Sequence, residues 1–279
     1  MKSFIFHDKA TAFPYPELCG TTPIEDLIVH LKNSGVTHIF LDSEKDYEGA
    51  TACDFESARQ QLGIGWLAAY SGCITRQSPA ELRDLTQTLG ADTGISLACS
   101  AKPWEHTTIL TDGRGFVEKV EENPPPENTE TNLCFSNLVW VATDEFDPDL
   151  PWGGRASAFL LPGYWKCPNS RENYLLTIHD LMCREVFPWP HLHIPDNGII
   201  LNSLIPGNIE IRGTLWVGNN CCIENGCILE NCVILDGSTV GANSNLRNCL
   251  VMDGARIPRN TVQYDKYLSF PGDDNGRED

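Results

Sequence analysis

Basic side chains are scarce in this chain of 279 residues. It has 20 Lys and Arg against 38 Asp and Glu, which gives a formal net charge of −18 at pH 7. Nucleic acids and anionic membranes bind proteins through clustered cations. The charge balance therefore argues against a nucleic acid or a membrane as a partner.

Long apolar stretches are also missing. No run approaches the roughly 18 apolar residues that a membrane-spanning helix needs. The apolar opening from Met1 to Phe6 is too short for the core of a secretory signal. On these grounds the sequence predicts a cytoplasmic protein.

Paired cysteine motifs are absent, although the chain has 12 cysteines. No Cys-x-x-Cys pair occurs, and the nearest neighbours are Cys221, Cys222, Cys227 and Cys232. Structural zinc needs converging ligands from such pairs, and disulfide scaffolds are usually short secreted chains. Free thiols that fill the core as small hydrophobic side chains are the favoured interpretation, with structural zinc the weaker alternative. We expect no bound cofactor.

The C-terminal third of the chain repeats an apolar residue about every six positions. These residues are Ile199, Ile205, Ile211, Val217, Ile223, Leu229, Ile234, Val240, Leu246, Val251 and Ile257. Because two of the steps are of five, equivalent positions such as Val217, Ile234 and Val251 fall 17 apart. Three six-residue steps per turn are typical of a parallel β-helix, whose coils stack through backbone hydrogen bonds. The pattern resembles left-handed hexapeptide β-helices, and a sandwich of short strands is the alternative.

Two other classes of residue fit the same coils. Asn, Asp and Gly recur where corners are expected, and they accept turn conformations. Four residues after many of the anchors the side chain is small, as at Cys221, Cys227, Ser238, Ser244 and Ala255. Such side chains are predicted to point inward as filler.

A β-helix of this kind has two common uses. One is acyl transfer, in which the family typically uses a histidine as general base. The last histidine in this chain is His193, which precedes the regular repeats. Acyl transfer is therefore the lesser alternative. The second use is as a C-terminal scaffold and oligomerisation module behind a nucleotidyltransferase domain.

A segment ahead of the repeats points to that second use. Gly163-Tyr164-Trp165-Lys166-Cys167-Pro168-Asn169-Ser170 precedes a helical pattern from Arg171 to Met182. The segment resembles the Gly-Tyr-Trp-x-Asp-x-Gly-Thr motif and following helix of sugar-1-phosphate nucleotidyltransferases. Such a relative would have a shortened, Rossmann-like α/β domain with a mixed or parallel sheet, followed by the β-helix.

The N-terminal half contains elements in the order that this resemblance implies. Apolar patterning predicts a strand at 3–6, an amphipathic helix at 23–34 and a buried strand at 36–41. The resemblance implies further strands at 66–74 and 133–141, and between them we expect a helix at 79–89 and a strand at 93–98. The predicted organisation is a nucleotidyltransferase-like domain at 1–185, a linker at 186–198, the β-helix at 199–268 and a disordered acidic tail at 269–279.

The chain departs from the family where its chemistry should be. The first strand runs into His7 to Phe13 without the glycine-rich nucleotide loop, and Pro16-Glu17 stands where the family has Pro-Lys. The resemblance places the two metal-binding aspartates at Cys73 and Cys167. Magnesium prefers oxygen ligands, so a site with cysteines at both of these positions is not expected to bind it as the family's aspartates do.

These departures leave several functional hypotheses open. The leading one is a catalytically inactive relative that acts as a ligand-binding, regulatory or assembly subunit, as a homo-oligomer or with an active paralogue. An active enzyme with a rearranged site and Mg²⁺ is the alternative. The resemblance assigns sugar-phosphate or nucleotide-sugar binding to Glu118 and Lys119, and we add Tyr164 and Trp165. Shared metal positions would bring Cys73 and Cys167 close together, either as two inert thiols or with a redox or soft-metal role.

Overall fold

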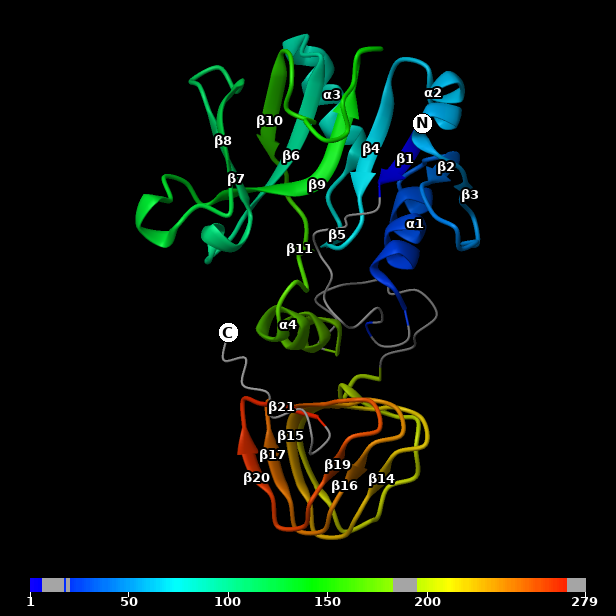
Figure 1. Ribbon diagram of the computed structural model, residues 1–279, viewed down its shortest axis with the longest axis vertical. Coiled ribbons are helices and arrows are strands. Elements are labelled where there is room, and N and C mark those ends of the chain that lie inside the picture. The colour runs from blue at the N-terminus through cyan, green and yellow to red at the C-terminus, as the bar shows by residue number, and fades with distance from the viewer. Residues whose placement is uncertain (7–17, 19–20, 183–194, 270–279) are drawn as a thin grey trace. The chain divides into compact units, whose positions relative to one another are not determined.

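The computed structural model describes residues 1–6, 18, 21–182 and 195–269 (Figure 1). Its contacts divide the chain into two compact units, Met1–Glu17 with Thr21–Cys167 and Leu18–Gly20 with Pro168–Asp279. The division differs from the predicted boundary at 185, because helix α4 (Arg171–Met182) groups with the second unit. Most of the predicted linker and tail, and the whole stretch from His7 to Glu17, lie outside the described residues.

The first unit is built on a mixed nine-stranded sheet. Its main path follows the order β10 (Ala156–Leu160), β6 (Thr93–Cys99), β9 (Leu133–Val141), β4 (Trp66–Tyr70), β1 (Lys2–Phe6), β2 (His38–Leu41) and β3 (Thr51–Ala52). Strand β9 runs antiparallel to its neighbours β4 and β6, whereas β4, β1, β2 and β3 are parallel. The hairpin of β7 (Thr107–Thr111) and β8 (Val117–Glu122) joins the sheet through β9. The expected mixed α/β sheet is confirmed.

Each face of this sheet has its own core, because side chains alternate along a strand. On one face, Ile5 and Leu67 belong to a cluster with the apolar residues of α1 (Pro23–Asn33) and α3 (Pro79–Leu89). On the other, Phe4 and Trp66 cluster with Leu62 of α2 (Phe55–Leu62). The sheet is thus buried on both sides and holds the strand ends in fixed register.

The sequence around α1 explains where that helix begins. Thr22 is the N-cap, and its hydroxyl accepts a hydrogen bond from Glu25 N at 3.2 Å. In return the Glu25 carboxylate accepts one from Thr22 N at 2.7 Å, and Pro23 occupies the first helical turn. This reciprocal capping satisfies amides that would otherwise lack partners.

The second unit contains stacked parallel coils with the predicted spacing. One sheet contains β12 (Ile199–Leu201), β13 (Glu210–Val217), β15 (Ile228–Ile234), β17 (Asn245–Arg247) and β20 (Val262–Tyr264), with β18 (Leu250–Val251) and β21 (Tyr267–Leu268) beside them. A second sheet contains β14 (Cys222–Ile223), β16 (Thr239–Val240) and β19 (Arg256–Ile257). Val217 lies opposite Ile234, and Ile234 opposite Val251, so neighbouring coils are 17 residues apart. We call residues 199–268 the coil region.

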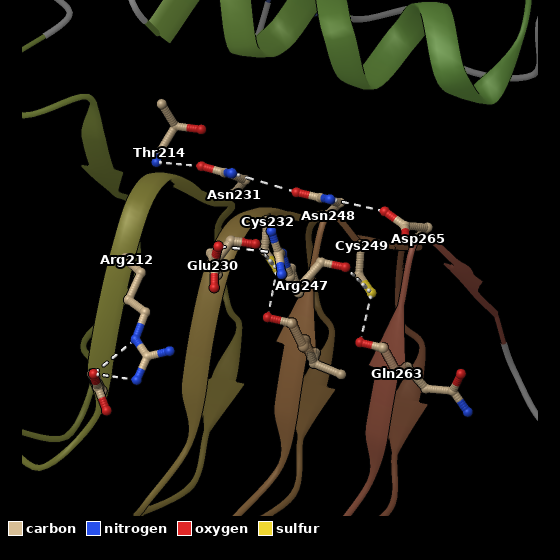
Figure 2. Close-up of polar contacts among 12 residues, drawn as sticks. Arg212, Thr214, Glu230, Asn231, Cys232, Arg247, Asn248, Cys249, Gln263 and Asp265 are labelled. Carbon is tan, nitrogen blue, oxygen red and sulfur yellow. Dashed lines mark hydrogen bonds and ion pairs between the residues drawn. The ribbon is translucent and has the colours of Figure 1, made fainter.

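The core of the coil region consists of the predicted anchors and fillers. The anchors from Val217 to Ile257 are buried, and so are the small side chains at Cys221, Cys227, Ser238, Ser244 and Ala255. Cys232 and Cys249 lie inside as well, and their thiols donate to carbonyl oxygens of the coils (Figure 2). Eight of the described cysteines are free thiols, and five of those eight are buried, as the filler interpretation predicts.

A ladder of amide side chains joins successive coils at one corner (Figure 2). Thr214 N donates to Asn231 Oδ1 at 3.1 Å, Asn231 Nδ2 to Asn248 Oδ1 at 3.4 Å, and Asn248 Nδ2 to Asp265 Oδ1 at 2.8 Å. The last three residues all have positive φ, between 49° and 53°, a region that Asn and Asp tolerate better than most residues. Gly213, with φ at 64°, lies against the top of the ladder.

Candidate functional site

Cys73 and Cys167 face each other across a short antiparallel ribbon. Strands β5 (Ile74–Thr75) and β11 (Trp165–Lys166) pair with Trp165 opposite Thr75 and Lys166 opposite Ile74. The next pair in this register is Cys73 and Cys167, which form a disulfide with their Cα atoms 4.2 Å apart. We call residues 73–77 and 163–167 the cysteine ribbon.

The disulfide corrects one part of the sequence interpretation. The two cysteines do come together, but as a covalent pair and not as the two inert thiols favoured above. The pairing spans 94 residues of sequence, and it depends on the antiparallel register of two strands that are only two residues long. The resemblance implied that the two cysteines lie close together, but the separation and brevity of the strands gave no local signal of a covalent bond between them.

Backbone contacts extend the ribbon beyond its two strands. Arg76 N donates to the Tyr164 carbonyl at 2.8 Å. Gly163, with φ at 126°, lies so close to Arg76 that a Cβ atom there would meet the Arg76 carbonyl oxygen at 2.7 Å. Glycine is therefore required at the start of the motif because the backbones approach closely.

A buried ion pair ties the ribbon to helix α1. The Arg76 guanidinium donates to both carboxylate oxygens of Asp26, at 2.6 and 2.8 Å, and the Asp26 side chain is only 2% exposed. Burial raises the pKa of Asp26, and the hydrogen bonds and charge of Arg76 oppose this rise. Both partners are fixed, so Arg76 is a structural cation here and is not available to a phosphate.

A second buried network holds the end of the ribbon. Gln77 Nε2 donates to the carbonyls of Leu97 and Leu161, at 2.8 and 3.2 Å, and Ser136 Oγ donates to Gln77 Oε1 at 2.6 Å. His30 Nε2 lies 2.9 Å from the Gln77 carbonyl, and burial lowers the pKa of His30. A neutral His30 that donates from Nε2 fits this contact. Three of these contacts hold backbone carbonyls and the fourth joins two buried side chains, which is the role of a structural network.

Trp165 and Tyr164 lie on the ribbon and are half-buried. The Trp165 ring meets the His106 ring edge-on, with centroids 5.0 Å apart. Trp165 Nε1 is buried and has no hydrogen-bond partner in the described part of the chain. Burial lowers the pKa of His106, which keeps this ring neutral near pH 7. Trp165 therefore offers an unused donor beside the disulfide.

Glu118 and Lys119 lie on strand β8 and are exposed. Lys119 Nζ pairs with Glu130 at 2.8 Å and with Glu121 at 3.1 Å. The hydrogen bond to Glu130, followed by that to Glu121, raises the pKa of Lys119. The structure thus places Lys119 of strand β8 between the carboxylates of Glu121 and Glu130, whereas Tyr164 and Trp165 belong to the cysteine ribbon.

Aromatic rings cover the carboxyl ends of β1 and β4. Phe6 stacks on Tyr70 with their ring centroids 5.3 Å apart. The centroids of Tyr70 and Phe135 are 5.5 Å apart, and those of Phe135 and Trp152 are 6.2 Å apart. The Tyr70 hydroxyl donates to the Pro148 carbonyl at 2.9 Å. This layer was not predicted from the sequence, although the alternation of Phe4 and Phe6 along β1, and the placing of Trp66 and Tyr70 on one face of β4, could have signalled it.

The residues present do not fit a magnesium ion. The positions assigned to its two carboxylates hold disulfide sulfurs, which offer a hard cation neither charge nor oxygen. No group of three or more His, Cys, Asp or Glu side chains with metal-site geometry occurs among the described residues. A two-carboxylate metal mechanism therefore has no support from these side chains.

The coil region matches a known family. A family model described as "GlmU-like, C-terminal hexapeptide" matches residues 192–265. The match covers the coil region and leaves the first unit without an assignment. A search of curated proteins found no match. In the described residues, no helix is long and apolar enough to cross a membrane.

Proposed function

We propose that this chain is a sugar-1-phosphate nucleotidyltransferase-like protein that does not perform the nucleotidyl transfer reaction. One observation carries the proposal: a disulfide joins Cys73 to Cys167, where the resemblance places both metal-binding aspartates. Phosphoryl and nucleotidyl transfer depend on a cation that neutralises charge on the reacting phosphates. With sulfur in both positions, and with Arg76 committed to Asp26, that neutralisation is lost.

The protein then acts through binding or assembly. The ligand proposed for the first unit is a sugar phosphate or a nucleotide sugar, recognised by Glu118, Lys119, Tyr164 and Trp165. The half-buried Trp165 ring supports this, because an aromatic face can pack against the C–H groups of a sugar ring. Lys119 supplies the positive charge that a phosphate needs, once a ligand competes with Glu121 and Glu130.

The coil region is proposed to be a left-handed β-helix that mediates assembly. Its 17-residue parallel register and the hexapeptide family match support a stacked coil, and flat coil faces suit pairing between subunits. The partner is a second copy of this chain or an active paralogue. The net charge of −18 supports neither nucleic acid nor an anionic membrane as a partner.

The compartment proposed from the sequence is the cytoplasm. The disulfide counts against this compartment, because such bonds persist mainly in oxidising compartments and are uncommon in the reducing cytosol. Reaction of Cys73 and Cys167 with a thiol-blocking reagent in intact cells would show whether the pair is oxidised there.

The decisive experiment measures pyrophosphate release from a panel of nucleoside triphosphates and sugar 1-phosphates with Mg²⁺. We expect no turnover above that of a boiled sample, with an active nucleotidyltransferase as the positive control. Sustained, Mg²⁺-dependent release would overturn the proposal and support the active alternative. An arm with acyl-coenzyme A tests the acyltransferase alternative, which the lack of histidine after residue 193 disfavours.

Thermal shift separates the binding role from the assembly role. A ligand that binds only the folded protein raises the unfolding temperature. We expect a nucleotide sugar or sugar phosphate to raise it equally with and without Mg²⁺, and Glu118→Gln to weaken the rise. Glu127→Gln is the matched control, because Glu127 is exposed and outside the proposed site. No shift across the panel would remove the ligand and leave assembly alone.

A further inference from the structure

A shallow, open cavity lies in the first unit where β6 ends and β9 begins. It has a volume of about 500 Å³ and lies between the segment that follows β6 and the segment that precedes β9. The short helices η1 (Pro103–Glu105) and η2 (Pro126–Asn128) contribute to its walls. Its lining includes Ser100, Trp104, Thr129, Glu130, Thr131 and Asn132. None of these residues belongs to the site proposed above.

Hydrogen bonds make this cavity rigid before any ligand arrives. Ser100 N donates to the Asn132 carbonyl at 3.0 Å and joins the two walls. Thr129 Oγ1 donates to the Pro125 carbonyl at 3.0 Å, and Thr131 Oγ1 accepts from Leu133 N at 3.1 Å. A preformed wall lowers the entropy lost on binding.

The polar lining is rich in groups that both donate and accept. Ser and Thr hydroxyls do so, the Asn132 amide has a donor and an acceptor end, and the Glu130 carboxylate accepts. The Asn132 side chain is exposed and has no hydrogen bond to the described residues. Such a mixture matches a ligand that is covered with hydroxyl groups.

Trp104 and the charge balance narrow the ligand class further. An aromatic face carries negative potential and attracts the weakly positive C–H groups of a sugar ring. The only charged residue in the lining is Glu130, whose charge is partly met by Lys119 at 2.8 Å. An anionic ligand would find no cation in the lining, so the cavity disfavours phosphates and nucleotides.

We propose that this cavity binds a neutral saccharide. Trp104 presents the surface for the C–H face of the sugar, and Glu130 and Asn132 form hydrogen bonds with its hydroxyls. This site and the proposed phosphate site share Lys119, which pairs with Glu130 in the absence of a phosphate. Their other contacts differ, Trp104 here and Trp165 there, so variants of these two residues distinguish failure of one proposal from failure of the other. Lys119 holds the Glu130 carboxylate in place and is a positioning residue.

Ligand-observed NMR on the full-length protein tests this site. The probes are glucose, galactose and N-acetylglucosamine, with glucose 1-phosphate and glycerol for comparison. We expect at least one neutral sugar to bind with a dissociation constant on the order of 1 mM, as is usual for one ring held by few contacts. Glucose 1-phosphate should bind more weakly at this site than its parent sugar, and glycerol should not bind.

Four variants decide whether the binding belongs to this cavity. Trp104→Ala and Glu130→Gln should each weaken sugar binding about tenfold or more, since each removes a principal contact. Trp104→Phe keeps an aromatic face and should retain part of the affinity, which guards against a folding defect in Trp104→Ala. Glu127→Gln removes a neighbouring charge outside the lining and should change nothing.

Three results would overturn the assignment. One is the absence of binding by any of the three sugars. Another is binding that survives both Trp104→Ala and Glu130→Gln. The third is tighter binding of glucose 1-phosphate than of glucose that is lost in Trp104→Ala and strengthened in Glu130→Gln, because this would show an anion site in the cavity.

Discussion

At the scale of single residues, the coil region depends on a glycine. Gly213 has φ at 64°, and a Cβ atom there would collide with Asn231 Oδ1. That oxygen accepts the hydrogen bond from Thr214 N that begins the amide ladder. A side chain at this position would therefore have two costs: it would strain the backbone, and it would displace Asn231 from the ladder.

We expect Gly213→Ala to lower the free energy of unfolding by about 1–3 kcal/mol, because left-handed backbone and a close contact both oppose it. Urea denaturation of the purified protein measures the change. Gly207→Ala is the matched control: Gly207 lies in the same region, is exposed, and has open space where a Cβ would go. Equal effects of the two substitutions would contradict the role of the ladder.

At the scale of elements, the cysteine ribbon is too short to be stable through its own hydrogen bonds. Two residues on each side pair as β5 and β11, and the disulfide closes a loop of 94 residues. Cross-links over long loops stabilise mainly by restricting the unfolded chain. The ribbon is thus predicted to depend on Cys73 and Cys167.

Replacing both with serine should lower the stability of the first unit by about 2–4 kcal/mol. Dithiothreitol should produce a similar loss in the natural protein and no further loss in the double variant, as followed by thermal unfolding. Cys99→Ser is the control, since Cys99 is an exposed free thiol. A reductant effect of equal size in both proteins would show that some other bond is responsible.

The elements also show what the sequence could and could not predict. The 17-residue register was predictable because each coil repeats the same local pattern, and Ile223, Val240 and Ile257 lie opposite one another as expected. Helices α3 and α4 and strand β9 occupy the predicted ranges, those of α4 and β9 having come from the family resemblance. Helix α2 and the β7 strand were missed. The closeness of Cys73 and Cys167 was expected from the resemblance, but their disulfide was missed, because it depends on the exact register of distant strands.

The candidate site was also predicted only in part, because some of its features are local in the sequence and others arise from contacts between distant segments. The motif around Trp165 could be recognised from local spacing, as could the odd cysteines at 73 and 167. The aromatic layer of Phe6, Tyr70 and their neighbours arises from segments brought together only by the sheet. Alternation along β1 and β4 indicates which of their rings share a face, but it does not report which rings of distant segments meet them.

At the scale of the whole molecule, the two units have separate cores. The sheet in the first unit is buried by two clusters, and the coil region has a third cluster of its own. Since cooperative unfolding follows contiguous cores, we expect two calorimetric transitions. Gly213→Ala should lower the midpoint of one, and the Cys73→Ser, Cys167→Ser pair should lower the other. A single transition that shifts in both variants would contradict independent units.

The disulfide has a mechanical consequence for a chain that is pulled from its two ends. Tension between the termini would pass directly from Cys73 to Cys167, so the strands β6 to β10 lie outside the load-bearing path. The bypassed segment represents ~320 Å of extended polypeptide. Reduction of one bond would release that length, and the oxidation state of a single pair therefore sets how far this protein can be stretched.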